Sequence, residues 1–279
     1  CTLLTGITLP GGLQELAPYL FSGCSSLGSV AIPDGVAAIR DHAFMDCVNL
    51  SAVSVPGTVT VIGWEAFLGC TSLTQFEIPA GVTSVMGNAF SGCSSLAGIT
   101  VDAANLKYSS IDGVLFNRAQ SVLKKFPEAK AGHYLVPASV THLEAGAFHA
   151  ASGLTQLKFL GDAPDPGTDV FGGTGSLTTV FYNSSRSGWG STLGGLTAVA
   201  APLPRVLQSG LGTGAKGREF SLTFSSVEGF SYSVQTSGDL QTWQHSRSFT
   251  GTGGPIGYSE SSEPGQAMPD RRYYRVVQN

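Results

Sequence analysis

The sequence predicts a mostly β protein: a leucine-rich-repeat-like solenoid with a parallel β-sheet, followed by a small β-sandwich domain. An internal repeat of 23 residues runs through the N-terminal part of the chain. Glycine, which weakens helices and favours turns, accounts for 37 of the 279 residues. After residue 204 the repeat is gone, and aromatic and polar residues alternate as in strands.

The repeat is defined by columns of identical residues that lie 23 positions apart. One column consists of cysteines and another of phenylalanines. Their members are Cys1, Cys24, Cys47, Cys70 and Cys93, and Phe21, Phe44, Phe67 and Phe90. A fixed period of this length is typical of solenoids in which each unit forms one coil. We therefore expect residues of one column to stack into a ladder.

Residues 24–46 show how one coil is built. Val30 and Ile32 alternate with small residues and indicate a short strand, which Pro33 ends because proline cannot donate to a ladder. Ile39 points a second segment inward, and a compact bend then returns the chain to the next cysteine. A single coil cannot bury its apolar edge alone, so neighbouring coils must stack with parallel strands.

These units resemble the BspA-like leucine-rich repeats of bacterial surface proteins. The units of that family carry a strand, an Ile-Pro pair, a Val-x-x-Ile segment and an Ala-Phe-x-x-Cys segment. Residues 108–116, which read YSSIDGVLF, are similar to a hairpin insertion of that family. The resemblance implies a leucine-rich-repeat solenoid over residues 1–204 with a hairpin insertion near residues 106–127. It also implies an extracellular or bacterial cell-surface location and a role in recognition or adhesion.

Residues 205–279 are expected to form a C-terminal β-sandwich that caps the solenoid. Phe220, Leu222 and Phe224 alternate with polar residues, and glycine and serine turns separate this run from later ones. Residues 235–243, which read QTSGDLQTW, are similar to short fibronectin-like modules at the C-terminus of exported proteins. An uncovered solenoid end exposes a strand edge and apolar faces, which such a domain can cover.

The cysteine column is interpreted as a ladder of buried free thiols. A 23-residue step places each thiol in its own coil, and the C-x-x-C spacing of metal sites is absent. Disulfides between adjacent coils and a lipid anchor on Cys1 are the alternatives. The sequence thus predicts no metal site and no cofactor.

The sequence contains no catalytic constellation, so we predict that the chain is not an enzyme. The histidines lack the H-E-x-x-H spacing, and neither a G-x-S-x-G elbow nor a phosphate-binding loop is present. Charged residues make up 12% of the chain and the net charge is −4, which argues against nucleic-acid binding. No stretch approaches the roughly 18–20 apolar residues of a transmembrane helix.

Candidate partner-binding residues lie on the outward face of the predicted sheet or near the end of the solenoid. They are Gln75, Glu77, Gln156, Lys158, Phe181, Tyr182 and Trp189. Small uncharged neighbours let a partner's backbone approach closely, and solenoid faces serve as docking surfaces. The hairpin over residues 112–116 is a second candidate. We expect a protein or glycan partner at a cell surface; a merely solvated sheet is the alternative.

Cys1 falls in the middle of a repeat unit, so the first coil presents an uncapped apolar edge. Either earlier repeats precede Cys1, or this edge pairs with another copy of the chain. Head-to-tail pairing would build an extracellular fibre. A structural subunit of such a filament, and an accessory domain of a larger exported protein, are therefore alternative functions.

Overall fold

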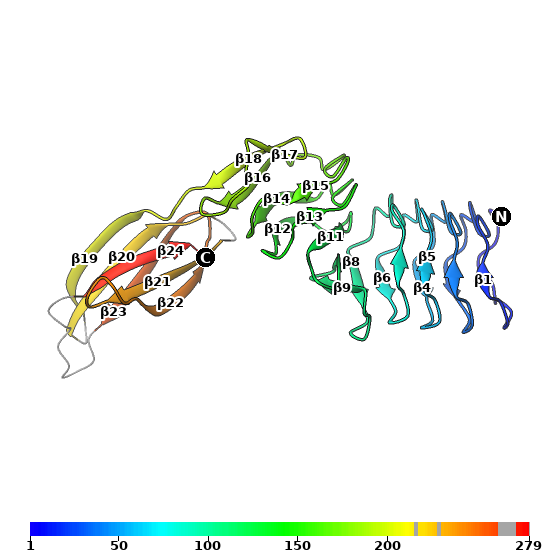
Figure 1. Ribbon diagram of the computed structural model, residues 1–279, viewed down its shortest axis with the longest axis horizontal. Helices are drawn as coiled ribbons and strands as arrows, with labels where there is room; N and C mark the ends of the chain where they lie inside the picture. The colour runs from blue at the N-terminus through cyan, green and yellow to red at the C-terminus, as the bar shows by residue number, and fades with distance from the viewer. Residues whose placement is uncertain (215–216, 228–229, 262–271, 279) are drawn as a thin grey trace. The chain divides into compact units, whose positions relative to one another are not determined.

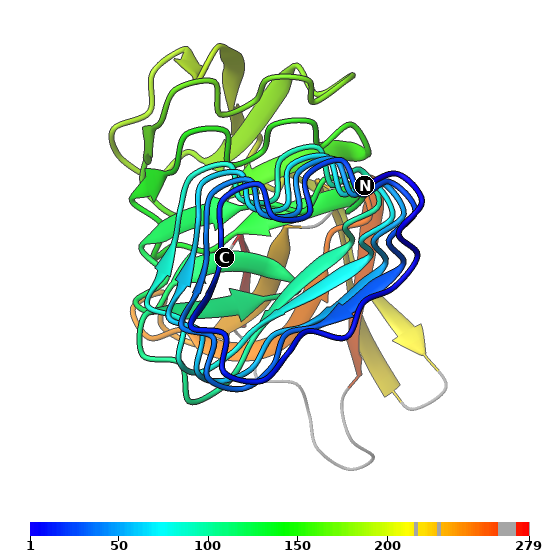
Figure 2. The same ribbon diagram turned by 90° about the vertical axis from the view of Figure 1, so that its right-hand side faces the viewer.

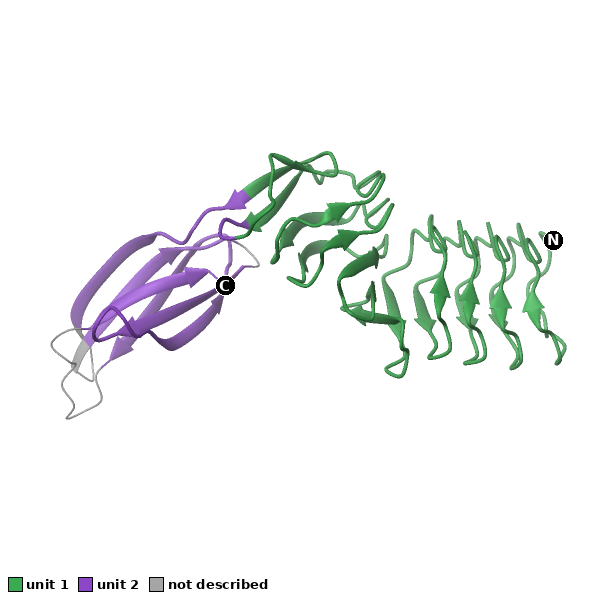
Figure 3. Cartoon of the chain, viewed as in Figure 1, with its two compact units in different colours: residues 1–182, 186–199 green, residues 183–185, 200–279 purple. Residues whose placement is uncertain are grey.

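A computed structural model describes residues 1–214, 217–227, 230–261 and 272–278, and the remaining parts of the predicted C-terminal domain lie outside the described residues. The chain divides into two compact units (Figure 3). The first comprises residues 1–182 and 186–199, and the second residues 183–185 and 200–279. All regular elements of the described residues are strands, which confirms the mostly β prediction.

The first unit begins with coils that each contribute two short parallel strands (Figure 1). One set forms a four-stranded parallel sheet of β1 (Glu15–Leu16), β3 (Ala38–Ile39), β5 (Val61–Ile62) and β7 (Ser84–Val85). The other set pairs as β2 (Ser29–Ala31) with β4 (Ala52–Ser54), and β6 (Gln75–Ile78) with β8 (Gly98–Val101). Partners differ by 23 residues, and Figure 2 shows coils of matching outline one behind another. The predicted parallel-sheet solenoid is confirmed.

The phenylalanine column forms a continuous stack through these coils. Ring centroids are 5.2 Å apart for Phe21 and Phe44, 5.2 Å for Phe44 and Phe67, and 5.7 Å for Phe67 and Phe90. All four rings are buried. Since a 23-residue step returns the chain to the same position in the next coil, identical residues meet and bury each other.

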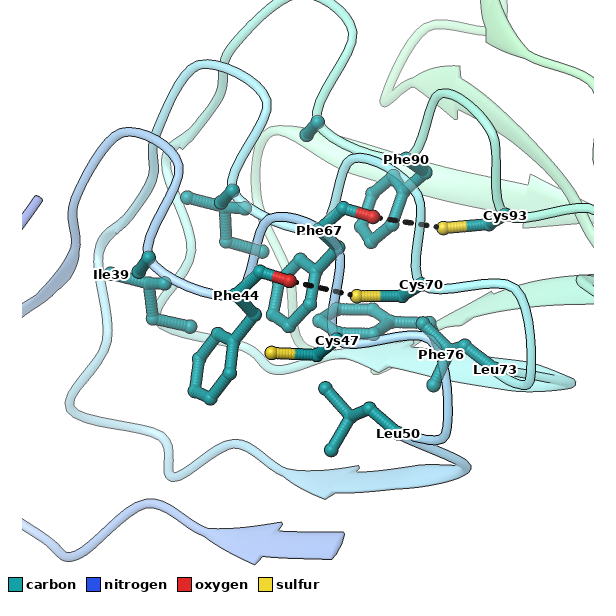
Figure 4. Packing of buried hydrophobic residues seen from close by; sticks show 14 of the residues in the cluster. Ile39, Phe44, Cys47, Leu50, Phe67, Cys70, Leu73, Phe76, Phe90 and Cys93 are labelled. Atoms are coloured by element: carbon teal, nitrogen blue, oxygen red, sulfur yellow. Dashed lines mark hydrogen bonds between the residues drawn. The ribbon is translucent and has the colours of Figure 1, made fainter. Parts of the chain in front are cut away.

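The cysteine column runs beside this stack. All five thiols are free, and every one except the exposed Cys1 is buried. The Sγ atoms of Cys47, Cys70 and Cys93 donate to the carbonyl oxygen of the phenylalanine 26 residues earlier, at 3.0, 3.1 and 3.2 Å. Figure 4 shows the bonds of Cys70 and Cys93 between consecutive coils. The thiols therefore act as small apolar residues that also carry a weak donor.

Most coils bend around their phenylalanine through two left-handed residues, placed two positions before and two after the ring, whereas the coil of Phe126 does not. The pairs are Tyr19 and Gly23, His42 and Asp46, Glu65 and Gly69, Asn88 and Gly92, Gly146 and Ala150, and Asp169 and Gly173. Glycine takes this conformation freely, and asparagine and aspartate tolerate it. Ala150, with φ of 60°, has neither advantage.

The hairpin insertion divides the solenoid into two hydrophobic cores. It consists of β9 (Tyr108–Ile111) and β10 (Val114–Asn117), followed by β11 (Val122–Lys125). Alternate side chains of a strand point to opposite faces. Leu115 accordingly joins the first core, whereas Val114 and Phe116 join the second.

A backbone ladder that links successive coils is interrupted at this junction. In the coils before the junction, the N–H two positions after the phenylalanine donates to a carbonyl of the next coil, as Gly69 does to Ser91 at 2.9 Å. At Gly92 the acceptor is instead the Oε1 atom of Glu128, at 2.9 Å. Glu128 is buried and also accepts from the Nζ of the buried Lys125, at 3.1 Å. A carboxylate thus replaces the missing carbonyl.

Beyond the junction the coils resume with a shifted register. The parallel sheet consists of β12 (Gly132–Val136), β14 (Leu154–Phe159) and β16 (Thr179–Asn183), and β18 (Leu196–Ala201) and β17 (Thr192–Leu193) extend it. β13 (His142–Leu143) and β15 (Asp165–Pro166) join β11 in the second sheet. Phe126 starts a new ring stack, 5.2 Å from Phe148.

The second unit consists of two three-stranded antiparallel sheets. One sheet contains β19 (Val206–Gly214), β20 (Gly217–Ser225) and β23 (Pro255–Ser261). The other contains β22 (Gln244–Thr250), β21 (Ser231–Ser237) and β24 (Tyr273–Gln278). Phe224 of the first sheet packs against Tyr232 of the second with ring centroids 5.7 Å apart. The alternating aromatics read from the sequence therefore bury one another between two sheets.

Candidate functional site

The outward strand positions of the first coils carry small or polar side chains and are nearly uncharged. Its exposed residues are Ser29 and Ala31 on β2, Ala52 and Ser54 on β4, Gln75 and Glu77 on β6, and Thr100 on β8. Ladder pairing sets Ser29 beside Ala52 and Glu77 beside Thr100. The structure therefore places Gln75 and Glu77 where the sequence predicts them, on an accessible sheet face.

Lys158 differs from the prediction, because it is fully buried rather than outward and exposed. Its ladder neighbours on β12 and β16 are Leu135 and Phe181. These large side chains replace the small residues of the earlier coils, and the aliphatic stem of a lysine packs well against such surface. Gln156, two positions earlier on β14, is half-buried.

The three aromatic candidates form a group near the end of the solenoid. The rings of Tyr182 and Trp189 stack in parallel with centroids 4.4 Å apart, and Trp189 packs edge-on against Phe159. The indole N–H of Trp189 donates to the carbonyl oxygen of Gly161 at 3.3 Å. Phe181, like the other two, is half-buried. Much of this aromatic surface thus serves packing within the coil.

The hairpin over residues 112–116 continues the strand stack instead of protruding freely. Asp112 and Gly113 have φ of 49° and 76°, the left-handed pair of a tight two-residue turn. The carbonyl of Gly113 accepts from the N–H of Ile99 at 2.8 Å. A Cβ on Gly113 would lie 3.0 Å from the Cα of Gly98, so the turn sits directly on β8 and needs glycine.

The buried thiols are unsuited to redox or metal chemistry. Burial raises the pKa of Cys47 to about 11 and that of Cys93 to about 12, and it raises the pKa of Cys70 further. A thiol is a nucleophile or metal ligand only as the thiolate. These three side chains therefore stay protonated and inert at neutral pH.

The described residues contain neither a candidate metal site nor a membrane-spanning helix. Within residues 1–214, 217–227, 230–261 and 272–278, no group of three or more His, Cys, Asp or Glu side chains is arranged to hold a metal ion. The same residues include no helix long and apolar enough to cross a membrane.

The ion pair at the junction is not evident from the sequence repeat. Lys125 lies in the insertion and Glu128 directly follows it, so neither belongs to a column of the repeat. The sequence signal that could have revealed this ion pair is the two opposite charges on either side of the apolar Phe126–Pro127 segment, because buried charges require partners.

Stacked coils with two parallel strand columns and an aligned phenylalanine stack are typical of a leucine-rich-repeat solenoid. A family model described as the BspA type leucine rich repeat region matches residues 1–122 in six copies. Residues 1–122 therefore consist of BspA-type leucine-rich repeats, as the resemblance implied.

Solved structures of bacterial leucine-rich-repeat proteins are similar to the chain. A leucine rich cell surface protein from Faecalibacterium prausnitzii is 28% identical with a TM-score of 0.52, and the match covers 67% of this chain and 56% of that protein. The pneumococcal vaccine antigen PcpA is 21% identical with a TM-score of 0.46, over 57% of this chain and 50% of PcpA. The chain thus spans about half the length of these two proteins. No curated protein matches the chain.

Proposed function

We propose that the chain is a non-enzymatic recognition module at a bacterial cell surface, which docks a protein or glycan partner on the outward face of β2, β4, β6 and β8. The observation that carries this proposal is the row of exposed side chains on these four strands. Glu77 is the charged residue of this row, and the others are polar or small and apolar. The similar cell surface protein from Faecalibacterium prausnitzii supports the location.

Physical chemistry favours docking on this face. Covering small uncharged side chains desolvates few strong polar groups, whereas burying an unpaired charge is costly. Ladder pairing holds β2 in register with β4 and β6 in register with β8, so a partner meets a largely preorganised surface and little ordering entropy is lost. The face therefore suits an extended partner that lies across several coils.

A binding screen with matched charge variants tests this proposal. The whole chain is immobilised and probed with purified cell-surface proteins and a glycan array, and binders are measured by interferometry. Gln75→Arg on the face should weaken binding at least tenfold, because it adds charge and bulk at the contact. Thr83→Arg adds the same charge to an exposed position outside the face and should leave binding unchanged. A panel without binders, or equal losses in both variants, contradicts the proposal.

A further inference from the structure

Strand β19 forms an edge of its sheet, and no strand of the described residues pairs with its outer side (Figure 1). It is nine residues long and pairs with β20 along its inner side. Every residue from 206 to 212 is exposed, including Leu207 at 55% and Leu211 at 72%. An edge strand has a row of backbone N–H and C=O groups that are free to pair with another strand. β19 is therefore a long, apolar and uncovered edge.

The other three edges of the two sheets carry residues that oppose pairing. β23 begins with Pro255 and contains Glu260, β22 contains Arg247, and β24 contains Arg275. Proline and charged side chains on an edge strand discourage the addition of a further strand. The sequence of β19, VLQSGLGTG, contains neither. Among the four described edges, β19 is thus the one open to pairing.

Leu211 of β19 points to the core side of its sheet but is not covered there. It lies opposite Phe220 of β20, and directly opposed residues of antiparallel strands share a face of the sheet. The Phe220 ring stacks on Tyr274 of the second sheet with centroids 3.8 Å apart. The second sheet therefore covers β20 at this point, while the leucine beside it on β19 stays in solvent. A further strand next to β19 would bury this leucine.

The spacing of the apolar residues makes β19 complementary to a second copy of itself. Leu207, Ser209 and Leu211 lie two positions apart, so strand alternation places them on one face. When two such strands run antiparallel with Ser209 at the twofold axis, Leu207 of each copy lies opposite Leu211 of the other. The irregular register with β20 lies between Val206 and Gln208, so the rest of the strand is regular. Like charges, which destabilise opposed strands, are absent from β19.

We propose that the chain forms a homodimer in which β19 pairs antiparallel with β19 of a second copy. The two three-stranded sheets then join into one continuous sheet, and the interface is isologous, with the same patch on both copies. Backbone hydrogen bonds along the paired strands supply the affinity, and the leucine pairs set the register. β19 belongs to the second unit and the proposed docking face to the first, so the dimer does not depend on that face.

Sedimentation equilibrium of the whole chain over a range of concentrations tests this proposal. The wild-type chain should form dimers as its concentration is raised. Leu211→Lys places a charge opposite Leu207 of the copy and should raise the dimer dissociation constant at least tenfold. Because Leu211 is largely exposed, this substitution should not disturb folding. Leu106→Lys adds the same charge at a residue of the solenoid that is 80% exposed and should leave the dissociation constant unchanged.

A cysteine at the twofold axis tests the register. Directly opposed residues of antiparallel strands have Cβ atoms roughly 4.5–5.5 Å apart, which is close to the separation in a disulfide. In a Cys1→Ser background, which removes the exposed thiol, Ser209→Cys should therefore give a covalent dimer under mild oxidation. Gln208→Cys is the control, because the two copies of this residue are diagonal neighbours roughly 7–8 Å apart. It should cross-link much less.

Several results would overturn the proposal. A wild-type chain that is monomeric at every concentration would leave β19 to a strand of a different protein. A dimer that Leu211→Lys leaves intact would place the contact elsewhere on the chain, and equal cross-linking at positions 208 and 209 would rule out the proposed register. Gln75→Arg should leave the dimer intact, so failure of the dimer and failure of the proposed docking face are separable.

Discussion

At the scale of single residues, the coils contain positions where the local conformation and the side chain disagree. Ala150 occupies the left-handed position that Gly23, Gly69 and Gly92 occupy in other coils. Such positions come from the left-handed bend around the phenylalanine, which most coils make. They identify residues whose substitution changes stability without touching any contact.

Ala150→Gly should stabilise the solenoid by about 0.5–1 kcal/mol, because relief of left-handed strain exceeds the entropic cost of glycine. The measurement is the free energy of unfolding in urea. Ala145→Gly is the control, since Ala145 is exposed and lies outside the left-handed positions. It should destabilise by about 0.5–1 kcal/mol. Loss of stability in both variants would contradict the strain argument.

The buried residues Tyr108 and Tyr134 should respond differently to loss of the hydroxyl. Tyr108→Phe leaves the buried N–H of Val85 without an acceptor and should cost about 1–3 kcal/mol. Tyr134→Phe removes a hydroxyl that has no partner and should be neutral or stabilising by up to about 1 kcal/mol. Urea titrations of both variants give the comparison. An equal cost for both would mean that Tyr134 has a polar partner in solution.

At the scale of elements, the cysteine ladder ties stability to pH. Cys47 and Cys93 have raised pKa values in the folded state, about 11 and about 12. In the unfolded chain the same thiols ionise above about pH 8.5. Ionisation therefore stabilises the unfolded state first, and the contribution of each thiol to folding is lost as the pH rises through the window from 8.5 to its folded pKa.

Unfolding free energy should accordingly fall by up to about 1.4 kcal/mol per pH unit for each buried thiol above pH 8.5. Urea unfolding at pH 7.5 and pH 9.5 measures the slope. Cys47→Ala should reduce it by the share of one thiol, and alanine suits this column because Ala151 occupies it in a later coil. An unchanged slope would show that Cys47 ionises in the folded state.

The junction between the two cores contains one buried carboxylate, that of Glu128. Glu128→Ala leaves the N–H of Gly92 without an acceptor and the ammonium of Lys125 buried and unpaired, so it should cost about 3–5 kcal/mol. The double variant Lys125→Met with Glu128→Gln keeps the acceptor, removes both charges and should recover most of that loss. Hydrogen exchange at Gly92, together with urea unfolding, distinguishes the two. A small effect of Glu128→Ala would show that water satisfies the junction.

At the scale of the whole molecule, the 23-residue period predicts the coils, their parallel pairing and the phenylalanine and cysteine columns. These features follow from the repeat, which can be recognised in the amino-acid sequence alone. The sequence did not predict that Phe126 starts a second ring stack. The insertion shifts the 23-residue register, so Phe126 does not fall in the column that ends at Phe90. Lys158 was misplaced because its burial depends on Leu135 and Phe181 in neighbouring strands.

The candidate site residues could likewise be predicted only where they follow from a repeating pattern in the sequence. Exposed positions on β6 follow from strand alternation, so Gln75 and Glu77 were found from the sequence. A hollow in the solenoid is lined by Asp112, Lys130, His133 and Tyr134 among others. Of these, the sequence singled out only Asp112, as part of the hairpin, because the other three lie in a segment without a repeat partner. Only the packing of the hairpin turn near β12 brings these groups together, and no spacing in the sequence encodes it.

The interrupted backbone ladder has a mechanical consequence. Hydrogen bonds between coils, such as that from the Phe67 N–H to the Ala89 carbonyl at 2.9 Å, are loaded one after another when the stack is stretched. Among the described residues, the equivalent N–H of Phe90 has no carbonyl partner in the next coil. Under tension we therefore expect the backbone ladder beside the phenylalanine stack to open first at this junction, where the Glu128 carboxylate replaces a carbonyl and the Ala129 N–H donates to the Leu96 carbonyl at 2.9 Å.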